Sequence, residues 1–233
     1  MSRFSLSQFV DQHAEQSLNQ GAFELESERV LEVNLAGQTN MVWMKMGAMV
    51  AYRGDIKFER EGMLEQGMGN LLKKAISGEG ARLSRATGQG KLYVADGGKR
   101  ITVLELAGES FFVNGNDLLC FTPTLKHEIT MMRKVSAIAS GGLFNVRVSG
   151  TGLVAIVSHG KPLVLRVTPS SPVFTDPQAT VAWSGSLTPE FKTDMSFKTL
   201  LGRGSGESFQ MAFHGDGFVV VQPYEETPFQ HQA

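Results

Sequence analysis

The stretch Gly88-Gln89-Gly90-Lys91-Leu92-Tyr93-Val94-Ala95 decides the fold, because its pattern returns twice along the chain. The second copy is Gly150-Thr151-Gly152-Leu153-Val154-Ala155-Ile156-Val157, and the third is Gly215-Asp216-Gly217-Phe218-Val219-Val220-Val221. A near-fixed spacing of this kind predicts one supersecondary unit that is used several times. Each glycine pair is expected to allow a tight turn or a bulge where a strand begins.

The first two copies share a further detail. Gly98-Lys99 follows Gly90 by eight residues, and Gly160-Lys161 follows Gly152 by eight. The likeness therefore extends beyond one strand.

The composition is that of a folded protein rich in turns. The chain has 233 residues, of which 42% are hydrophobic, 19% are charged and 26 are glycine. All-β proteins of this length often form a single unit. The formal net charge of −1 argues against a general nucleic-acid binder, which needs a basic surface. The mildly basic run from Lys73-Lys74 to Arg82 and Arg85 contains Glu79, so a solvated face is expected there.

Alternating apolar residues predict antiparallel strands. Val146 and Val148 alternate with Arg147 and Ser149, which indicates a strand with one buried face. The run Leu153–Val157 is apolar on both faces, which predicts burial in a second layer or at a subunit contact. Arg53-Gly54-Asp55 resembles a hairpin turn. Strands at short spacings favour an antiparallel sandwich or barrel.

Three segments depart from this pattern. Residues 1–22 are expected to form an N-terminal arm, 23–224 one β domain with internal repeats, and 225–233 a polar tail. Leu64, Met68, Leu71, Leu72 and Ala75 recur at helical spacing, so a helix is predicted over 63–76, ended by Gly78 and Gly80. Packing across the mouth of a sheet is favoured for that helix over a membrane or partner role.

The sequence predicts a cytoplasmic protein. The start carries Asp11 and Glu15 and lacks the apolar core of a signal peptide, and no run reaches the roughly 18 apolar residues of a membrane helix. Cys120, the single cysteine, lies in a predicted strand and is expected to be a small buried hydrophobic residue rather than a nucleophile.

No residues are assigned to catalysis, to a cofactor or to a metal. A cupin-type metal site needs clustered histidines. The histidines here, with none close to another, are His13, His127, His159, His214 and His231. His127 and Glu128 fall on opposite faces of a strand, and His159 and His214 are expected in exposed turns.

Other chemical motifs are equally weak. Each GxG is followed by a strand, whereas a phosphate loop leads into a helix. Gly108-Glu109-Ser110 and Gly206-Glu207-Ser208 lack the GxSxG pattern of a nucleophile elbow. Glu225-Glu226 belongs to the polar tail. Two methionine groups are expected to fill the core or a subunit interface; they are Met41, Met44, Met46 and Met49, and Met131-Met132.

Several glycine-containing stretches resemble one known family. They are Gly47-Ala48-Met49-Val50-Ala51-Tyr52-Arg53-Gly54, Gly78-Glu79-Gly80, Gly142-Leu143-Phe144 and Trp183-Ser184-Gly185. Together with the spaced GxG strands, they resemble the altered-inheritance-of-mitochondria family, from about Phe23 to Tyr224. Phe112-Val113-Asn114-Gly115-Asn116-Asp117 and Phe174-Thr175-Asp176-Pro177 look like its actinobacterial branch.

The resemblance implies a TRAP-like fold, a double-stranded β-helix or jelly-roll sandwich with one or two short helices. It also implies a homo-oligomer, with the trimer as the expected form. Eukaryotic relatives are mitochondrial, but this location is not carried over because no transit peptide is evident. The family offers no catalytic residues to transfer.

Three functions therefore remain open. The first is a non-enzymatic oligomeric scaffold or binding protein with an unknown protein partner. The second is nucleic-acid binding by analogy with the TRAP-like fold. The third is an enzyme or small-ligand binder with its site in the mouth of a barrel.

Overall fold

Antiparallel strands make up most of the described chain, which confirms the all-β prediction. The computed structural model describes residues 3–16, 21–37, 39–60, 83–131, 144–193 and 209–225. The one helix in these ranges is α1 (Leu6–His13). The strands are β1 (Phe23–Ser27), β2 (Val30–Asn34), β3 (Met41–Lys45), β4 (Met49–Arg60), β5 (Leu83–Val94), β6 (Arg100–Asn114), β7 (Leu118–Phe121), β8 (Lys126–Met131), β9 (Phe144–Ser158), β10 (Leu163–Val167), β11 (Val173–Thr175), β12 (Thr180–Ser184), β13 (Glu190–Thr193), β14 (Phe209–Phe213) and β15 (Gly217–Val221).

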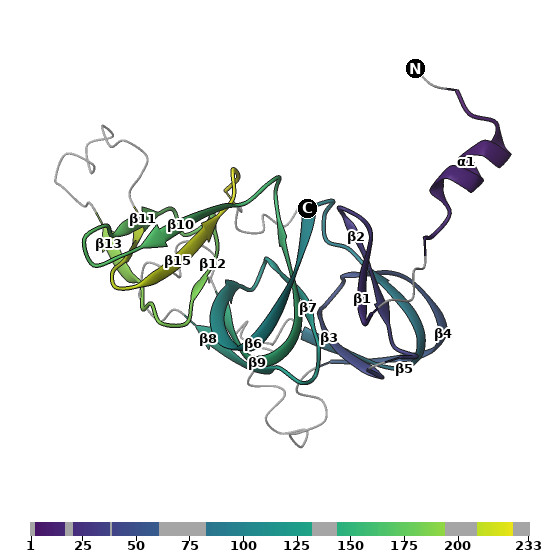
Figure 1. The fold of residues 1–233 in the computed structure, drawn as a ribbon, viewed down its shortest axis with the longest axis horizontal. Coiled ribbons are helices and arrows are strands. Elements are labelled where there is room, and N and C mark those ends of the chain that lie inside the picture. Colours follow the sequence, from purple (N-terminus) through teal and green to yellow (C-terminus); the bar gives the residue numbers. More distant parts are fainter. Residues whose placement is uncertain are drawn as a thin grey trace, which may run out of the picture.

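The described strands form a large curled sheet and a small one. The large sheet has the order β1-β2-β5-β3-β7-β9-β6-β12-β15-β10, and β4 and β8 pair with β5 and β9 beside this path. The small sheet has the order β11-β14-β13. Figure 1 shows β1–β5 at one end of the molecule, β6–β9 in the middle and β10–β15 at the other end. The finer description as a TRAP-like, internally repeated fold stays a prediction.

Strand β9 lies between two cores, which explains its apolar sequence. Ala155 and Val157 belong to a cluster with residues of β2, β3 and β5. Val154 and Ile156 belong to a second cluster with residues of β6, β7 and β12. The predicted second layer is therefore found within one chain, and the burial of residues 154–157 requires no subunit contact, while Leu153 is half-buried. Val146 and Val148 are also fully buried, as their alternation predicts.

The glycine pairs of the first two copies lie in the middle of long strands, so the prediction that they mark strand starts is wrong there. Gly88 and Gly90 lie within β5, and Gly150 and Gly152 lie within β9. A Cβ atom on Gly90 would lie 1.9 Å from the carbonyl oxygen of Arg53. Glycine lets the backbones of β4 and β5 approach closely at this bend.

The predicted hairpin at Arg53-Gly54-Asp55 is also wrong, because all three residues lie inside β4. Gly54 has a φ of 96° and pairs with Gly90. Positive φ bends the strand here, but its pairing with β5 continues on both sides. In the third copy, Gly217 begins β15, as predicted.

Helix α1 lies within the predicted arm and is defined by its N-terminal cap. Ser5 Oγ accepts a hydrogen bond from the backbone N–H of Gln8 at 3.2 Å, and Gln8 Oε1 accepts one from the N–H of Ser5 at 2.9 Å. This reciprocal capping box satisfies two of the amides at the start of the helix. The helix predicted over 63–76 lies outside the described residues. Among the described helices, none has the length and apolar content needed to cross a bilayer.

Candidate functional site: a buried polar network at the strand ends

The network is built around the turn that joins β6 to β7. Asn114 Oδ1 accepts a hydrogen bond from the N–H of Asn116 at 3.0 Å, and the carbonyl oxygen of Asn114 accepts one from the N–H of Asp117 at 2.8 Å. Asparagine favours such turns because its side chain can replace a backbone acceptor. The turn confirms the predicted Asn-Gly-Asn signal and places Asp117 at the end of the sheet.

A fully buried ion pair lies beneath this turn. Lys99 Nζ lies 3.0 Å from Asp117 Oδ1, and the two side chains are 6% and 0% exposed. Lys99 is positioned by the turn after β5, in which its N–H donates to the carbonyl oxygen of Asp96 at 2.9 Å. A buried charge is costly unless it is paired, so each of these side chains depends on the other.

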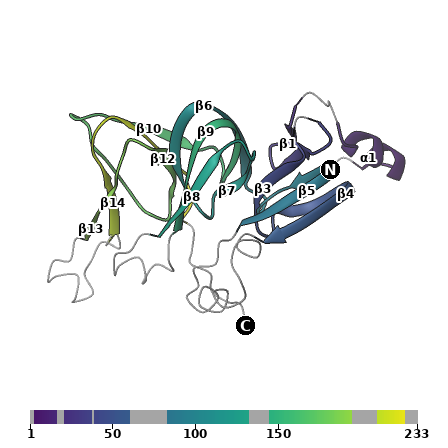
Figure 2. The ribbon, with the colours of Figure 1, turned by 90° about the horizontal axis from the view of Figure 1, so that it is seen from below.

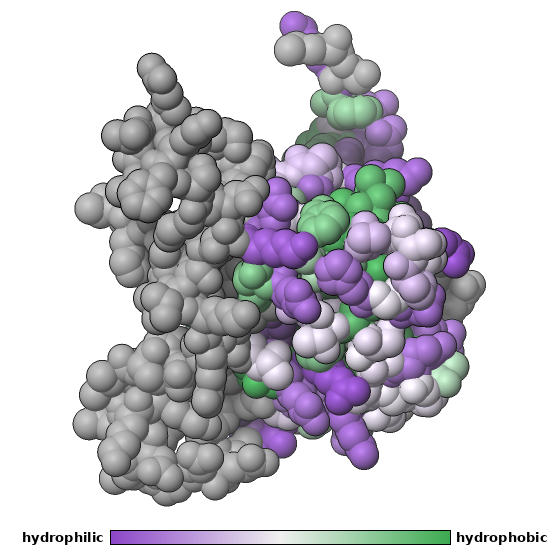
Figure 3. Space-filling view, turned by 90° about the vertical axis from the view of Figure 1, so that its left-hand side faces the viewer, coloured by the Kyte–Doolittle hydropathy of each residue, from purple (hydrophilic) through white to green (hydrophobic). Residues whose placement is uncertain are grey.

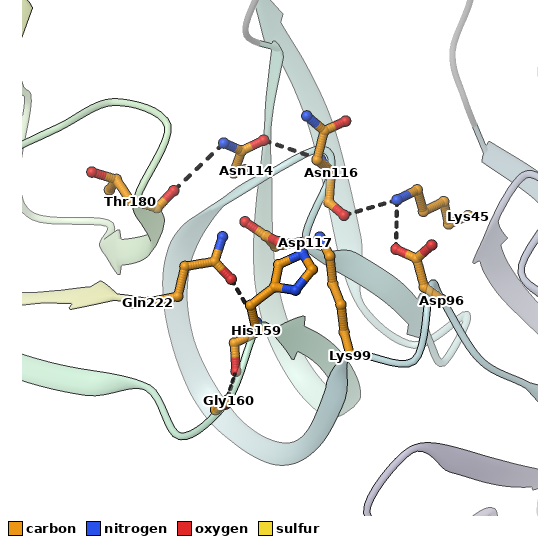
Figure 4. Close-up of polar contacts among 11 residues, drawn as sticks. Lys45, Asp96, Lys99, Asn114, Asn116, Asp117, His159, Gly160, Thr180 and Gln222 are labelled. Carbon is orange, nitrogen blue, oxygen red and sulfur yellow. Dashed lines mark hydrogen bonds and ion pairs between the residues drawn. The ribbon is translucent and has the colours of Figure 1, made fainter. Parts of the chain in front are cut away.

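A second lysine connects the same turns to β3. Lys45 Nζ lies 2.7 Å from Asp96 Oδ2 and donates a hydrogen bond to the carbonyl oxygen of Asn116 at 2.8 Å. Its side chain is only 16% exposed. Lys45 therefore joins the turn after β5 to the turn after β6 (Figure 4).

The network continues toward the β10–β15 end. Asn114 Nδ2 lies 3.5 Å from the carbonyl oxygen of Thr180, at the start of β12. Gln222 Oε1, just after β15, accepts a hydrogen bond from the N–H of His159 at 2.7 Å. The ring of His159 lies over Tyr224, with 3.9 Å between the ring centroids. These contacts join three parts of the sheet at one set of strand ends.

The network links turns from different parts of the sheet through ion pairs and hydrogen bonds. Each lysine faces a carboxylate, and Asn114, Asp117, Ser158, Thr180 and Gln222 are all buried. Such a network of buried polar contacts specifies one arrangement of the turns, although Gln222 Nε2 is buried without a hydrogen-bond partner among the described residues. The copies of the repeat differ here, because Lys99 is buried while Lys161, its counterpart in sequence, is exposed.

A second polar cluster holds the residues after α1 against the sheet. Tyr93 donates a hydrogen bond to Glu15, and Arg53 Nη2 lies 2.8 Å from Glu15 Oε1. The bond from Tyr93 lowers the pKa of Glu15 below its usual value, and the guanidinium of Arg53 adds to this effect. Burial, followed by hydrogen bonds to Glu15 and Glu32, raises the pKa of Tyr93. Lys91 Nζ lies 3.0 Å from the fully buried Glu32.

The histidines do not converge within the described residues. His127 packs against both Trp43 and Phe121, with ring centroids 5.2 and 5.1 Å away. His13 stacks on Phe9 of α1, and His214 is exposed as predicted, whereas His159 is half-buried. His231 lies outside the described part of the chain. Within the described ranges, no group of three or more His, Cys, Asp or Glu side chains is placed to hold a metal.

Cys120 is a core residue, as predicted. It is 0% exposed in β7, and burial raises the pKa of its thiol. Met44 is buried, as core filling predicts. Met46 and Met49 are 42% and 40% exposed, so they do not fill the core of one chain, and their place in a subunit interface stays a prediction.

Arg85 of the basic run pairs with Glu59. Glu225 is exposed. Outside the described residues lie Lys73, Lys74, Glu79, Arg82, Met132, Ser208 and Glu226.

Comparison with known proteins shows the family. The family described as Mitochondrial biogenesis AIM24 matches residues 23–224, and the chain belongs to it. The crystal structure of protein SPYM3_0169 from Streptococcus pyogenes has a similar fold, with a TM-score of 0.69 and 21% sequence identity. The match covers 87% of this chain and 92% of that one. No curated protein matches this sequence.

Proposed function

We propose that this chain is a non-enzymatic oligomeric scaffold or binding protein. The observation that carries the proposal is the set of large apolar side chains exposed on three surfaces. One is α1, one is the outer strand β4, and one is the end formed by β10, β11 and β15. Large exposed apolar patches mark interaction sites more often than single exposed residues do.

Helix α1 has an apolar face that no other part of the described chain covers. Leu6, Phe9 and Val10 are 81%, 51% and 55% exposed, at the spacing of one helical face. None of the residues of α1 is buried. An amphipathic helix with this pattern is suited to a groove on another protein surface.

The β10–β15 end is a second candidate surface. Leu163 and Val164 of β10 are 58% and 57% exposed, and Phe174 of β11 is 47% exposed. Figure 3 views this end and shows apolar surface between polar patches. A protein partner suits such a mixed surface, because interface cores are apolar and their rims polar.

The reactive groups of the described residues support a non-enzymatic role. The Cys120 thiol is buried and its pKa is raised, which opposes formation of the nucleophilic thiolate. The buried Lys99 and Asp117 are engaged with each other. In this proposal both groups serve stability.

The finer parts of the proposal rest on the sequence. They are a trimeric assembly, descent from the actinobacterial branch, a cytoplasmic location and a TRAP-like fold built by internal repetition. The single cysteine is in keeping with a reducing compartment.

Native mass spectrometry of the purified protein over a concentration series tests the proposal. A homo-oligomer of bare 25.3 kDa chains is the expected result. Extra mass from a stoichiometric metal, nucleotide or lipid would contradict it and favour a ligand-binding or enzymatic role. RNA retention on a filter that falls as salt is raised would instead support nucleic-acid binding.

A further inference from the structure

Strand β4 has an unpaired outer edge along its described length. It pairs through residues 49–60 with β5 on one side, and no other described strand pairs with it. Figure 2 shows β4 at the margin of its end of the molecule. An outer strand of this length presents a row of backbone donors and acceptors that can pair with another chain.

The two faces of β4 carry different chemistry. One face presents the alternating charges Arg53, Asp55, Lys57 and Glu59, of which the first three are exposed and the last is half-buried. The other face presents Tyr52, Gly54, Ile56 and Phe58. Ile56 is 7% exposed and enters the core, but Tyr52 and Phe58 remain 48% and 38% exposed. Their rings contact each other with centroids 5.5 Å apart.

We propose that β4 of one chain pairs antiparallel with β4 of a second copy, around a two-fold axis at Ile56. Arg53 then lies opposite Glu59 of the second copy, and Asp55 lies opposite Lys57 of the second copy. The symmetry repeats both pairs, so the seven residues from 53 to 59 bring four opposite-charge pairs together. Opposite charges directly across an antiparallel pair are favourable, and like charges are unfavourable.

The charges select this register. Moving the two-fold axis by one residue, to Asp55 or to Lys57, shifts the register by two residues and sets Asp55 opposite Asp55, or Lys57 opposite Lys57. A register that pairs odd-numbered with even-numbered residues would set the charged face against the apolar one. Pairing around Ile56 is therefore the arrangement in which both faces match.

The apolar face supports the same register. Phe58 lies opposite Gly54 of the second copy, and an aromatic ring across from a glycine covers exposed backbone. Tyr52 lies opposite Arg60 of the second copy, where a guanidinium can stack on the phenol ring. Two partly exposed rings from each copy would then be covered.

The inference rests on the proposed function, because it names one surface through which the oligomer forms. The competing explanation is that the charges protect an outer strand from pairing, a common feature of β proteins. In that case two chains do not associate through β4. Substitutions of Asp55 and Lys57 distinguish the two explanations, because neither residue forms an ion pair with another described residue. Arg53 and Glu59 do form such pairs.

Charge exchange at these two positions is the test. Asp55→Lys sets a new lysine opposite Lys57 of the second copy, and Lys57→Asp sets a new aspartate opposite Asp55 of the second copy. Each variant alone should therefore dimerise at least about tenfold more weakly. Mixed together, the two variants have opposite charges across the axis and should form a one-to-one heterodimer.

Analytical ultracentrifugation and native mass spectrometry of each variant and of the mixture measure the association. Glu105→Lys, at an exposed position of β6 outside the three candidate surfaces, is the matched control and should leave association unchanged.

A disulfide trap measures the register itself. Asp55→Cys and Lys57→Cys chains should crosslink to each other under mild oxidation, because directly opposed residues have Cα separations within disulfide range. Either variant alone should crosslink poorly. The buried Cys120 leaves little background.

Three results would overturn the inference. They are a wild-type protein that stays monomeric at high concentration, an oligomer that ignores both charge reversals, and an assembly with an odd number of subunits. The last two leave the proposed oligomeric scaffold intact and move its interface elsewhere, whereas a monomer contradicts both proposals. The proposed trimer and this two-fold pairing are compatible only as two trimers joined into a hexamer, so an isolated trimer would overturn the pairing.

Discussion

Lys99 and Asp117 form an ion pair inside the protein, with 3.0 Å between Nζ and Oδ1. The two residues come from different turns, and their side chains are shielded from water. Because neither charge is solvated, each stabilises the position of the other and joins the turn before β6 to the turn after it.

Lys99→Met should destabilise the protein by about 3–5 kcal/mol, because the Asp117 carboxylate is left buried without its counter-charge. Urea unfolding gives the change in free energy. The double variant Lys99→Met with Asp117→Asn should regain part of the loss. Arg100→Met, which removes an exposed pair with Glu28, is the control and should cost about 0–1 kcal/mol. Equal losses of unfolding free energy in the Lys99→Met and Arg100→Met variants would contradict a special role for the buried pair.

Gly90→Ala should lower the melting temperature strongly. The residue has a φ of 149°, and its new methyl group would meet the carbonyl oxygen of Arg53 at 1.9 Å. Strained backbone alone costs about 1–3 kcal/mol. Gly37→Ala is the control, because its Cβ would meet Asn34 at an ordinary 3.6 Å. A Gly90→Ala protein with unchanged melting would mean that β4 and β5 are not this close.

Val146→Asp should prevent folding, because Val146 is 0% exposed in β9 and a carboxylate there would have no partner. Circular dichroism and size-exclusion chromatography measure the outcome. Thr151→Asp changes an exposed position of the same strand and should stay folded. A folded, monodisperse Val146→Asp protein would show that the face assignment of β9 is wrong.

Tyr93→Phe should raise the pKa of Glu15 toward 4.5, because the hydrogen bond from the phenol is the largest cause of its lowered pKa. Because the pKa of Glu15 is lower in the folded state, the ionised carboxylate stabilises that state at pH values above its unfolded pKa. This contribution is lost as the pH falls through the folded pKa. NMR titration of the Glu15 carboxyl carbon measures the shift. Tyr224→Phe is the control and should leave the Glu15 titration unchanged. An unaltered midpoint in Tyr93→Phe would mean that the contact is absent in solution.

Several elements could be predicted from the sequence because local patterns specify them. The alternation around Val146 and Val148 gave the buried face of β9, and Asn114-Gly115-Asn116 gave the turn after β6. The burial of Cys120 followed from its apolar neighbours. These features depend on residues close together in the chain, so short-range periodicity and turn chemistry were enough.

The sequence does not predict the polar network, although Gly98-Lys99 belongs to the repeat. Lys99 and Lys161 occupy equivalent positions in sequence, yet one is buried against Asp117 and the other is exposed. No local sequence pattern distinguishes the buried lysine from the exposed one, because burial depends on which distant turn packs above each side chain.

The sequence by itself determined that this is an all-β member of its family, with glycine pairs along its strands and a single buried cysteine. The tertiary structure decided where the glycines act, since Gly54, Gly88 and Gly90 matter through the close approach of β4 and β5 rather than through turns of their own. It also decided which charges are buried and which strand edge has no partner among the described strands. Both depend on pairings between residues far apart in the chain, and local sequence preferences do not encode those pairings.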